Sequence, residues 1–185
     1  MIDELLQDAR EHMDKSVEST RQKFQSVRTG RATPALLDRI AVEYYGVVTP
    51  LNQMATIGAP EPRMLTVQPY DKSAVKAVER AIMESDLGIT PNNDGTLIRL
   101  VLPELTEERR KQLVKVVRQL TEDGKVALRN VRRDVMHDLK ELRDAGEAGA
   151  DDEHRAEEAL QKLTDEKVKE LDVLLKGKEA EILEV

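Results

Sequence analysis

The sequence predicts an α+β protein: an elongated antiparallel three-helix bundle with a small inserted α/β domain that is mostly β. Three long segments repeat apolar residues at spacings of three and four, typical of amphipathic helices. All seven prolines lie between Pro34 and Pro103, outside those segments. The charged fraction is 35% and the aromatic fraction 2%, which favours long exposed helices around a thin aliphatic core.

The first predicted helix occupies the N-terminal segment. Its apolar positions are Ile2, Leu6, Ala9, Met13, Val17, Thr20, Phe24 and Val27. Their recurrence on one face indicates a helix that packs along a single stripe.

The middle of the chain, residues 31–104, has a different pattern. Strands are predicted at 40–45, 64–68 and 97–102, where β-branched, aromatic and leucine residues predominate. One helix interrupts them, with Asp71 as a plausible N-cap and Val75, Val78, Ala81 and Ile82 on its apolar face. Residues 92–95, Asn-Asn-Asp-Gly, predict a turn before the last strand.

The second long helix opens at Thr106, a good N-cap, and Glu107 and Glu108 suit the positive end of its dipole. It is predicted to end near Asp144, before an Ala/Gly-rich stretch. The third begins near Asp151, and its near-heptad apolar positions are Ala156, Leu160, Leu163, Val168, Leu171, Leu175 and Ile182. Helices of this length, on the order of 50 Å or more, are most easily buried side by side.

These elements predict a discontinuous domain organisation. Residues 1–30 and 104–185 form the bundle, and 31–103 form the inserted domain. Hinges are expected near 28–31 and 103–105, at Thr29, Gly30, Pro103, Glu104 and Leu105, because a double connection between two domains is a natural hinge. Gly30 can also simply terminate the first helix.

The sequence carries no catalytic constellation. There is no cysteine, His12, His137 and His154 fall on separate segments, and neither a phosphate-binding Gly-rich loop nor a Gly-x-Ser-x-Gly motif occurs. We therefore expect no enzyme activity, no metal site and no cofactor. The acidic N-terminus lacks a signal peptide and no apolar run could span a membrane, so a cytoplasmic protein without membrane contact is expected.

The strongest functional signal is a basic stretch from Arg109 to Arg133. It holds nine Lys/Arg against two acids, in a chain of net charge −7. On a helix, the apolar residues of this region fall within an arc of about 80°. Roughly opposite lie Lys111, Lys115, Arg118, Lys125, Arg129, Arg132 and Arg133. One local basic stripe on an acidic protein indicates a specific polyanion site.

The alternative is that this stripe is a solvated helix face. Acids of neighbouring helices could neutralise it, although few acids lie within 109–133 itself. If it binds nucleic acid, a rigid rod with arginines suits phosphate and shape contacts with RNA. The aromatic content is too low for a base-stacking platform.

The chain resembles the bacterial ribosome recycling factor family along nearly its whole length. The resemblance is carried, in order, by segments 27–32 (VRTGRA), 44–46 (YYG), 49–55 (TPLNQMA), 86–100 (DLGITPNNDGTLIRL), 103–110 (PELTEERR) and 131–134 (VRRD). It implies an L-shaped, two-domain, monomeric factor that is not itself an enzyme. It also implies binding to a post-termination ribosome on large-subunit (23S-type) rRNA. Elongation factor G, hydrolysing GTP, would then help split the ribosome and release messenger and tRNA.

The resemblance also implies which residues contact the rRNA. These are Arg129, Arg132 and Arg133, with Arg110 and, near the bend, Arg28 and Arg31; Arg132 is expected to matter most. A second class of function stays open, a structural or chaperone-like coiled-coil protein that clasps partners through its long helices. A stable dimer would favour that alternative, and a monomer would favour the translation factor.

Overall fold

The computed structural model describes residues 1–184. The described residues pack as two compact units: a bundle of residues 1–24 with 114–180, and a lobe of residues 25–113 with 181–184. Both predicted hinge segments, 28–31 and 103–105, lie within the lobe as the packing defines it.

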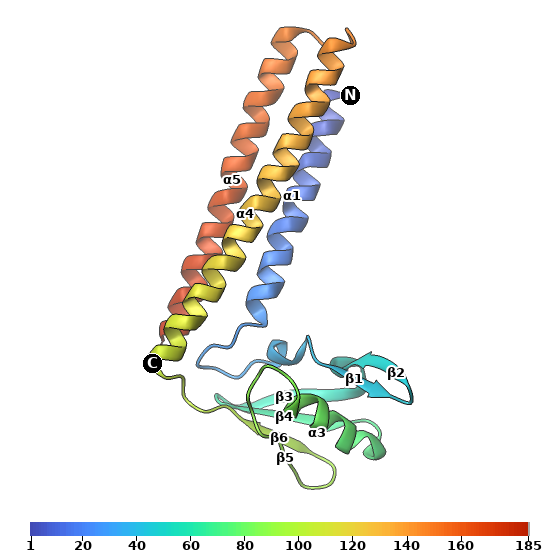
Figure 1. Ribbon diagram of the computed structural model, residues 1–185, viewed down its shortest axis with the longest axis vertical. Helices are drawn as coiled ribbons and strands as arrows, with labels where there is room; N and C mark the ends of the chain where they lie inside the picture. Colours follow the sequence, from blue (N-terminus) through green and yellow to red (C-terminus); the bar gives the residue numbers. More distant parts are fainter. Residues whose placement is uncertain (185) are drawn as a thin grey trace. The chain divides into compact units, whose positions relative to one another are not determined.

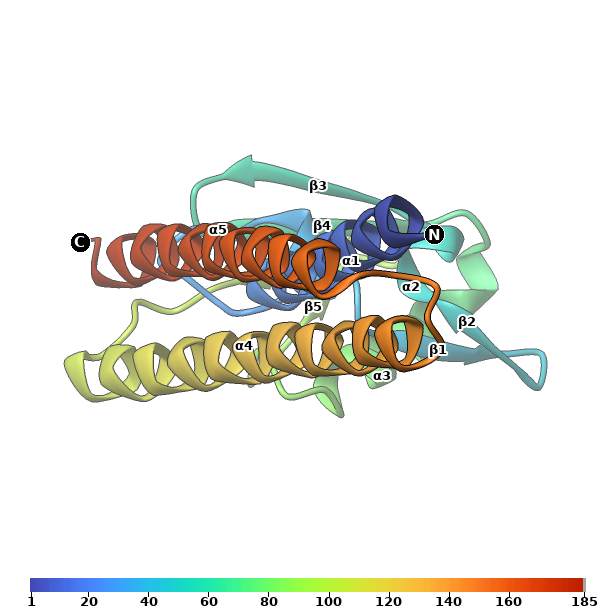
Figure 2. The same cartoon turned by 90° about the horizontal axis from the view of Figure 1, so that it is seen from above.

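Three helices build the bundle: α1 (Ile2–Gln25), α4 (Glu107–Asp144) and α5 (Ala150–Leu183). They run side by side, with α4 antiparallel to the other two (Figures 1 and 2). The buried core is contributed by all three, at Ala9, Met13, Val17, Leu128, Val135, Leu139, Ala156, Leu160, Leu163 and Leu171. The apolar stripes predicted from the sequence therefore face one another, and the α+β class with a helical bundle is confirmed.

Close packing in the bundle depends on one glycine. A Cβ at Gly124 of α4 would lie 2.6 Å from Thr20 Oγ1 and 3.1 Å from Leu171 Cδ1. The buried hydroxyls of Thr20, Thr121 and Thr164 donate to the carbonyls four residues earlier in their own helices. These bonds leave the hydroxyls satisfied inside an otherwise aliphatic interface.

Helix ends follow the expected capping chemistry. Thr106 Oγ1 accepts a hydrogen bond from the amide of Arg109 at 3.1 Å, which confirms the predicted N-cap of α4. Gly146 follows α4 with a φ of +75°, and the amide of Glu147 donates back to Leu142 O, as in a helix ended by a left-handed residue. Acids fill the first turn of α5.

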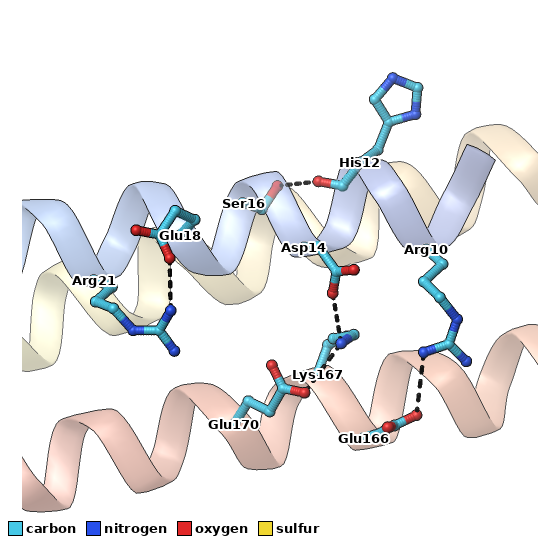
Figure 3. Close-up of polar contacts among 9 residues, drawn as sticks. All are labelled: Arg10, His12, Asp14, Ser16, Glu18, Arg21, Glu166, Lys167 and Glu170. Carbon is cyan, nitrogen blue, oxygen red and sulfur yellow. Dashed lines mark hydrogen bonds and ion pairs between the residues drawn. The ribbon is translucent and has the colours of Figure 1, made fainter. Parts of the chain in front are cut away.

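Ion pairs join α1 to α5 (Figure 3). Lys167, only 6% exposed, lies 2.5 Å from Asp14 Oδ1 and 3.0 Å from Glu170 Oε1. Burial lowers the pKa of Lys167, but the hydrogen bonds to Asp14 and Glu170 outweigh it, so the net pKa is raised. The buried ammonium therefore stays charged and paired.

The lobe contains a four-stranded antiparallel sheet in the order β3 (Ala55–Glu61), β4 (Met64–Pro69), β6 (Ile98–Val101), β5 (Asn92–Asn93). A separate hairpin pairs β1 (Ala41–Tyr44) with β2 (Val47–Pro50). Helix α3 (Val75–Met83) packs against β1 and β4, and a short α2 (Leu51–Met54) leads into β3. Two 3₁₀ turns, Pro34–Leu37 and Lys72–Ala74, complete the unit.

Alternation along the strands produces the lobe's core. Leu65 stands opposite Leu100, and Val67 opposite Ile98, and all four side chains are fully buried. The predicted strands correspond to β1, β4 and β6, whereas β2, β3 and β5 were not predicted. β3 contains Gly58 and Pro60, which argue against a strand in sequence, but its edge position tolerates a proline.

Asp71 caps the 3₁₀ turn before α3 rather than α3 itself. Its Oδ1 accepts from the amide of Ser73 at 2.9 Å, and its Oδ2 accepts from the Tyr44 hydroxyl at 2.5 Å. The Tyr44 bond, followed by the Ser73 bonds, lowers the pKa of Asp71, and the same bond to Asp71 raises the pKa of Tyr44 to about 12. The predicted apolar face of the helix is confirmed, with Val75, Val78 and Ile82 buried.

Candidate nucleic-acid interface

The basic stripe lies on the solvent-facing side of α4, as the sequence predicted. Leu113, Val117, Leu128 and Val135 of the opposite face are buried. The basic positions are exposed or half-buried, at Lys111, Lys115, Arg118, Lys125, Arg129, Arg132 and Arg133. The buried apolar side chains and the basic side chains therefore lie on opposite faces of α4.

Acids neutralise part of this stripe. Arg118 Nε lies 2.6 Å from Glu179 Oε1, and this hydrogen bond raises the pKa of Arg118. Lys125 Nζ lies 2.8 Å from Asp172 Oδ1, and a hydrogen bond to Asp172 is the main cause of its raised pKa. Both acids belong to α5, so this stretch of charge is compensated inside the bundle.

The neighbouring stretch is not compensated. Arg129 and Arg132 form no ion pair with any of residues 1–184 that the structure describes, and Arg133 only approaches the adjacent Asp134, at 3.8 Å. The Nε of Arg132 is shielded from solvent and has no hydrogen-bond partner within the described chain. Among the described residues, Arg132 therefore has neither an ion pair nor a hydrogen bond from its Nε.

A second group of arginines lies in the lobe unit. Arg28 Nη2 donates to the carbonyl oxygen of Pro103, while the Nε atoms of Arg28 and Arg110 are buried and lack a partner among residues 1–184. Burial, and then the charge of Arg109, lower the pKa of Arg28. The Arg28 guanidinium therefore lies in a partly buried environment of like charge.

Arg31 and Arg109 differ from the rest of this second group. Arg31 lies 3.9 Å from Glu184, an exposed and weak pair. Arg109 belongs to the predicted basic stretch but was not among the predicted RNA-contacting residues; its effect on Arg28 only becomes visible once the lobe has folded. The structure thus brings Arg28 and Arg109 together, and it places Arg129, Arg132 and Arg133 along one stretch of α4.

The described residues, 1–184, contain no group of three His, Asp or Glu side chains arranged to hold a metal ion. His137 and His154 each lie 3.2 Å from a glutamate one turn away, at Glu141 and Glu158, on exposed helix surface. Within the same residues no helix is long and apolar enough to cross a membrane.

A family model described as ribosome recycling factor matches residues 20–183. The chain belongs to the ribosome recycling factor family. It is 56% identical over 180 residues to the ribosome-recycling factor of Rubrobacter xylanophilus, covering 97% of each chain. It is 54% identical over 185 residues to that of Thermobifida fusca, covering all of both.

Solved structures agree with this assignment. A solution structure of a ribosome recycling factor matches with a TM-score of 0.78 at 40% identity, covering 100% of this chain and 98% of the other. A second match has a TM-score of 0.68 at 48% identity, with both chains fully covered. It belongs to models of the Thermus thermophilus ribosome recycling factor and the Escherichia coli elongation factor G bound to the E. coli post-termination complex. The family expected from the sequence is confirmed, and with it a role in ribosome recycling.

Proposed function

We propose that this protein is a cytoplasmic, monomeric and non-enzymatic factor that binds the post-termination ribosome through large-subunit rRNA. Together with elongation factor G, which hydrolyses GTP, it splits the ribosome into subunits and allows messenger and tRNA to leave. The relative seen with elongation factor G on a post-termination complex supports this assignment.

The uncompensated arginines of α4 are the observation that carries the RNA contact. Arg129 and Arg132 project from one stretch of a rigid helix and lack the α5 partners that neutralise Arg118 and Lys125. A guanidinium presents a planar fork that matches phosphate oxygens in bidentate fashion. We therefore assign RNA binding to Arg132 first, then Arg129 and Arg133.

Arg28, Arg31 and Arg110 form the second part of the proposed interface, and we add Arg109 to them. The Nε atoms of Arg28 and Arg110 have no hydrogen-bond partner among residues 1–184, and burial, followed by the charge of Arg109, lowers the pKa of Arg28. Phosphate would satisfy these donors and relieve the repulsion between Arg28 and Arg109.

The bundle's packing supports a monomer over a clasping coiled coil. The apolar stripes of α1, α4 and α5 bury one another within a single chain. Within residues 1–184, the larger exposed apolar residues of the bundle are Met1, Val116, Val126 and Val173, and no two of them have the spacing of three or four residues that a coiled-coil seam needs.

The first test is co-sedimentation with isolated large and small ribosomal subunits across a salt series. We expect binding to the large subunit alone, weakening as salt rises because phosphate contacts release counterions. If the folded protein bound neither subunit, the basic stripe would be only a solvated helix face. A dimer in solution under the same conditions would move the coiled-coil alternative to first place.

We also propose a mobile hinge. Its residues are Thr29, Gly30, Pro103, Glu104 and Leu105. The Arg28–Pro103 hydrogen bond ties the two connections to each other, so they would bend together. Gly30→Pro should slow splitting more than it weakens large-subunit binding, because proline restricts both its own φ and the residue before it. Gly30→Ala is the matched control, since among residues 1–184 a Cβ there would meet only Glu184 O, at 3.6 Å. Equal losses of binding and splitting in Gly30→Pro would contradict the hinge.

A further inference from the structure

Two cations of α4 are paired with two carboxylates of α5 in a regular register. Lys125 Nζ lies 2.8 Å from Asp172 Oδ1. Arg118 Nε lies 2.6 Å from Glu179 Oε1. On each helix the two charged residues are seven positions apart, so they lie on the same flank of the helix, two turns from each other. Because α4 and α5 run antiparallel and side by side (Figures 1 and 2), this spacing produces a ladder of interhelical ion pairs.

The ladder stops one step short of what its register allows. Seven residues further along α4 and seven residues back along α5, the next pair would join Arg132 to Asp165. No ion pair joins these two within residues 1–184, and Asp165 Oδ1 instead accepts a hydrogen bond from Gln161 Nε2 at 2.9 Å. Matching positions in the sequence therefore do not neutralise a cation by themselves; the two helices must also lie close enough together.

Gly124 brings α4 close to α5 at the ladder. A Cβ at Gly124 would lie 2.6 Å from Thr20 Oγ1 and 3.1 Å from Leu171 Cδ1, so a larger residue would push α4 away from both neighbouring helices. Gly124 directly precedes Lys125, and Leu171 directly precedes Asp172. Because the distance between packed helices depends on the side chains at their contact, Gly124 sets the distance across which this ion pair forms.

A glycine at this position is unfavourable for the helix itself. Gly124 lies in the interior of a helix of 38 residues, where glycine loses more conformational freedom on folding than alanine does. Its backbone is helical and has no positive φ, so no turn requires a glycine there. The property that glycine supplies at position 124 is therefore the close approach of the neighbouring helices.

We propose that Gly124 is a specificity-determining residue for RNA binding. By holding α4 close to α5 it keeps Arg118 and Lys125 neutralised, and this confines RNA attachment to the uncompensated arginines of 129–133. The inference rests on the proposed function, in which α4 binds rRNA.

Neutralisation matters because the paired cations are within reach of RNA. The side chain of Arg118 is 63% exposed even in its ion pair, so a phosphate can approach it once Glu179 withdraws. Every RNA offers phosphates, whatever its sequence. Two additional free cations would therefore strengthen binding to incorrect RNA as well as to the correct site.

The direct test is Gly124→Ala. The added methyl group should separate the helices and weaken both ion pairs, while the higher helix propensity of alanine offsets part of the cost of overpacking. Gly177→Ala is the matched control on α5, because among residues 1–184 nothing lies within 4 Å of the Cβ that it adds. Combining Thr20→Ala with Gly124→Ala should restore wild-type behaviour. It removes the closest atom, and the contact that remains is with a terminal methyl group of Leu171, which can rotate.

A second route frees the same cations without adding an atom to the interface. Asp172→Asn combined with Glu179→Gln removes both carboxylates and leaves the packing around Gly124 as it is. This variant tests the same idea even if Gly124→Ala does not fold, which circular dichroism and urea unfolding would reveal.

The measurement is the affinity for a double-stranded RNA of random sequence, by fluorescence anisotropy across a salt series, with large-subunit co-sedimentation in parallel. For Gly124→Ala and for the charge variant we expect the affinity for random RNA at low salt to rise roughly fourfold, about twofold for each freed cation. The log–log dependence on salt should steepen by about 1.4 to 1.8, the counterion release expected from two more phosphate contacts. Large-subunit affinity should rise by no more than about twofold, so the preference for the large subunit falls. A purely structural role of Gly124 would change the unfolding transition and leave the salt dependence unchanged.

Three results would overturn the inference. If folded Gly124→Ala and Gly177→Ala bound random RNA alike, Gly124 would be a packing residue only. If the charge variant bound random RNA like the wild type, the ion pairs would not limit RNA binding. If Thr20→Ala did not reverse the effect of Gly124→Ala, the distance between the helices would not be its cause. Failure of the wild-type protein to bind the large subunit would instead reject the proposed function, a result distinct from any difference between variants on random RNA.

Discussion

Two stretches on the same face of α4 carry similar basic residues but differ in whether carboxylates neutralise them. In the stretch 118–125 of α4, Arg118 and Lys125 are held at 2.6 and 2.8 Å by Glu179 and Asp172 of α5. In the stretch 129–133, Arg129 and Arg132 have no ion pair with the described residues 1–184. A basic stripe in sequence is therefore not equivalent to a basic surface.

The difference has a simple electrostatic origin. A guanidinium already paired to a carboxylate gains little from a phosphate, because the first partner must be displaced or repelled. An unpaired guanidinium offers its full charge to a phosphate, and Arg132 has no ion pair with residues 1–184. We therefore expect residues 129–133 to contribute more of the RNA affinity than residues 118–125. Substitutions in 129–133 should accordingly weaken binding more.

Arg132→Ala should have the largest effect. We expect large-subunit affinity to fall roughly tenfold to hundredfold, the range for losing charged hydrogen bonds to phosphate. Arg132→Lys should recover only part of the loss, because an ammonium cannot form the bidentate fork. Co-sedimentation measures the affinity, and circular dichroism should show unchanged helical content. Wild-type affinity in Arg132→Ala would remove this residue from the interface.

Arg129→Ala should weaken binding several-fold. The log–log dependence of affinity on salt should become shallower by about 0.7 to 0.9, the change expected when one fewer phosphate is neutralised. Arg118→Ala is the matched control on the same face. Because Glu179 already neutralises Arg118, we expect the affinity of Arg118→Ala for the large subunit to stay within about twofold of that of the wild type. Equal reductions in the two variants would show that pairing within the bundle does not govern binding.

Glu179→Gln should have the opposite effect, because it removes the carboxylate that lies 2.6 Å from Arg118 Nε. The freed guanidinium should raise large-subunit affinity by about twofold and steepen its salt dependence. Filter binding at low and high salt measures both quantities. An unchanged affinity would indicate that Arg118 lies outside the RNA footprint, whatever its charge state.

Lys125→Met should have the smallest effect, and it should appear in stability rather than binding. A hydrogen bond to Asp172 raises the pKa of Lys125, so the pair's contribution is present below the unfolded value of about 10.4 and is lost as pH rises through the folded value. Urea unfolding should therefore show a decrease of about 0.5 kcal/mol in the free energy of unfolding at neutral pH that disappears above the folded pKa. A difference that persists unchanged in strong alkali would assign the decrease to packing.

Much of the fold could be predicted from the sequence, because its signals are local. The periodicity of Leu113, Val117, Leu128 and Val135 correctly predicted the buried face of α4, and Thr106 capped it as expected. Strands with a clear alternation, such as 98–101, were also predicted. β3 was not, since a strand containing Pro60 becomes tolerable only at a sheet edge, and edge position is a property of the assembled sheet.

The sequence by itself determined the family, the amphipathic helices and the position of the basic stripe on α4, because spacing along a helix dictates which face a side chain occupies. Only the tertiary structure decided which of those cations stay available. Glu179 and Asp172 are distant along the chain from Arg118 and Lys125, and they neutralise them only because α5 packs beside α4. Charge compensation at a few ångströms depends on proximity in space, which no local pattern of residues encodes.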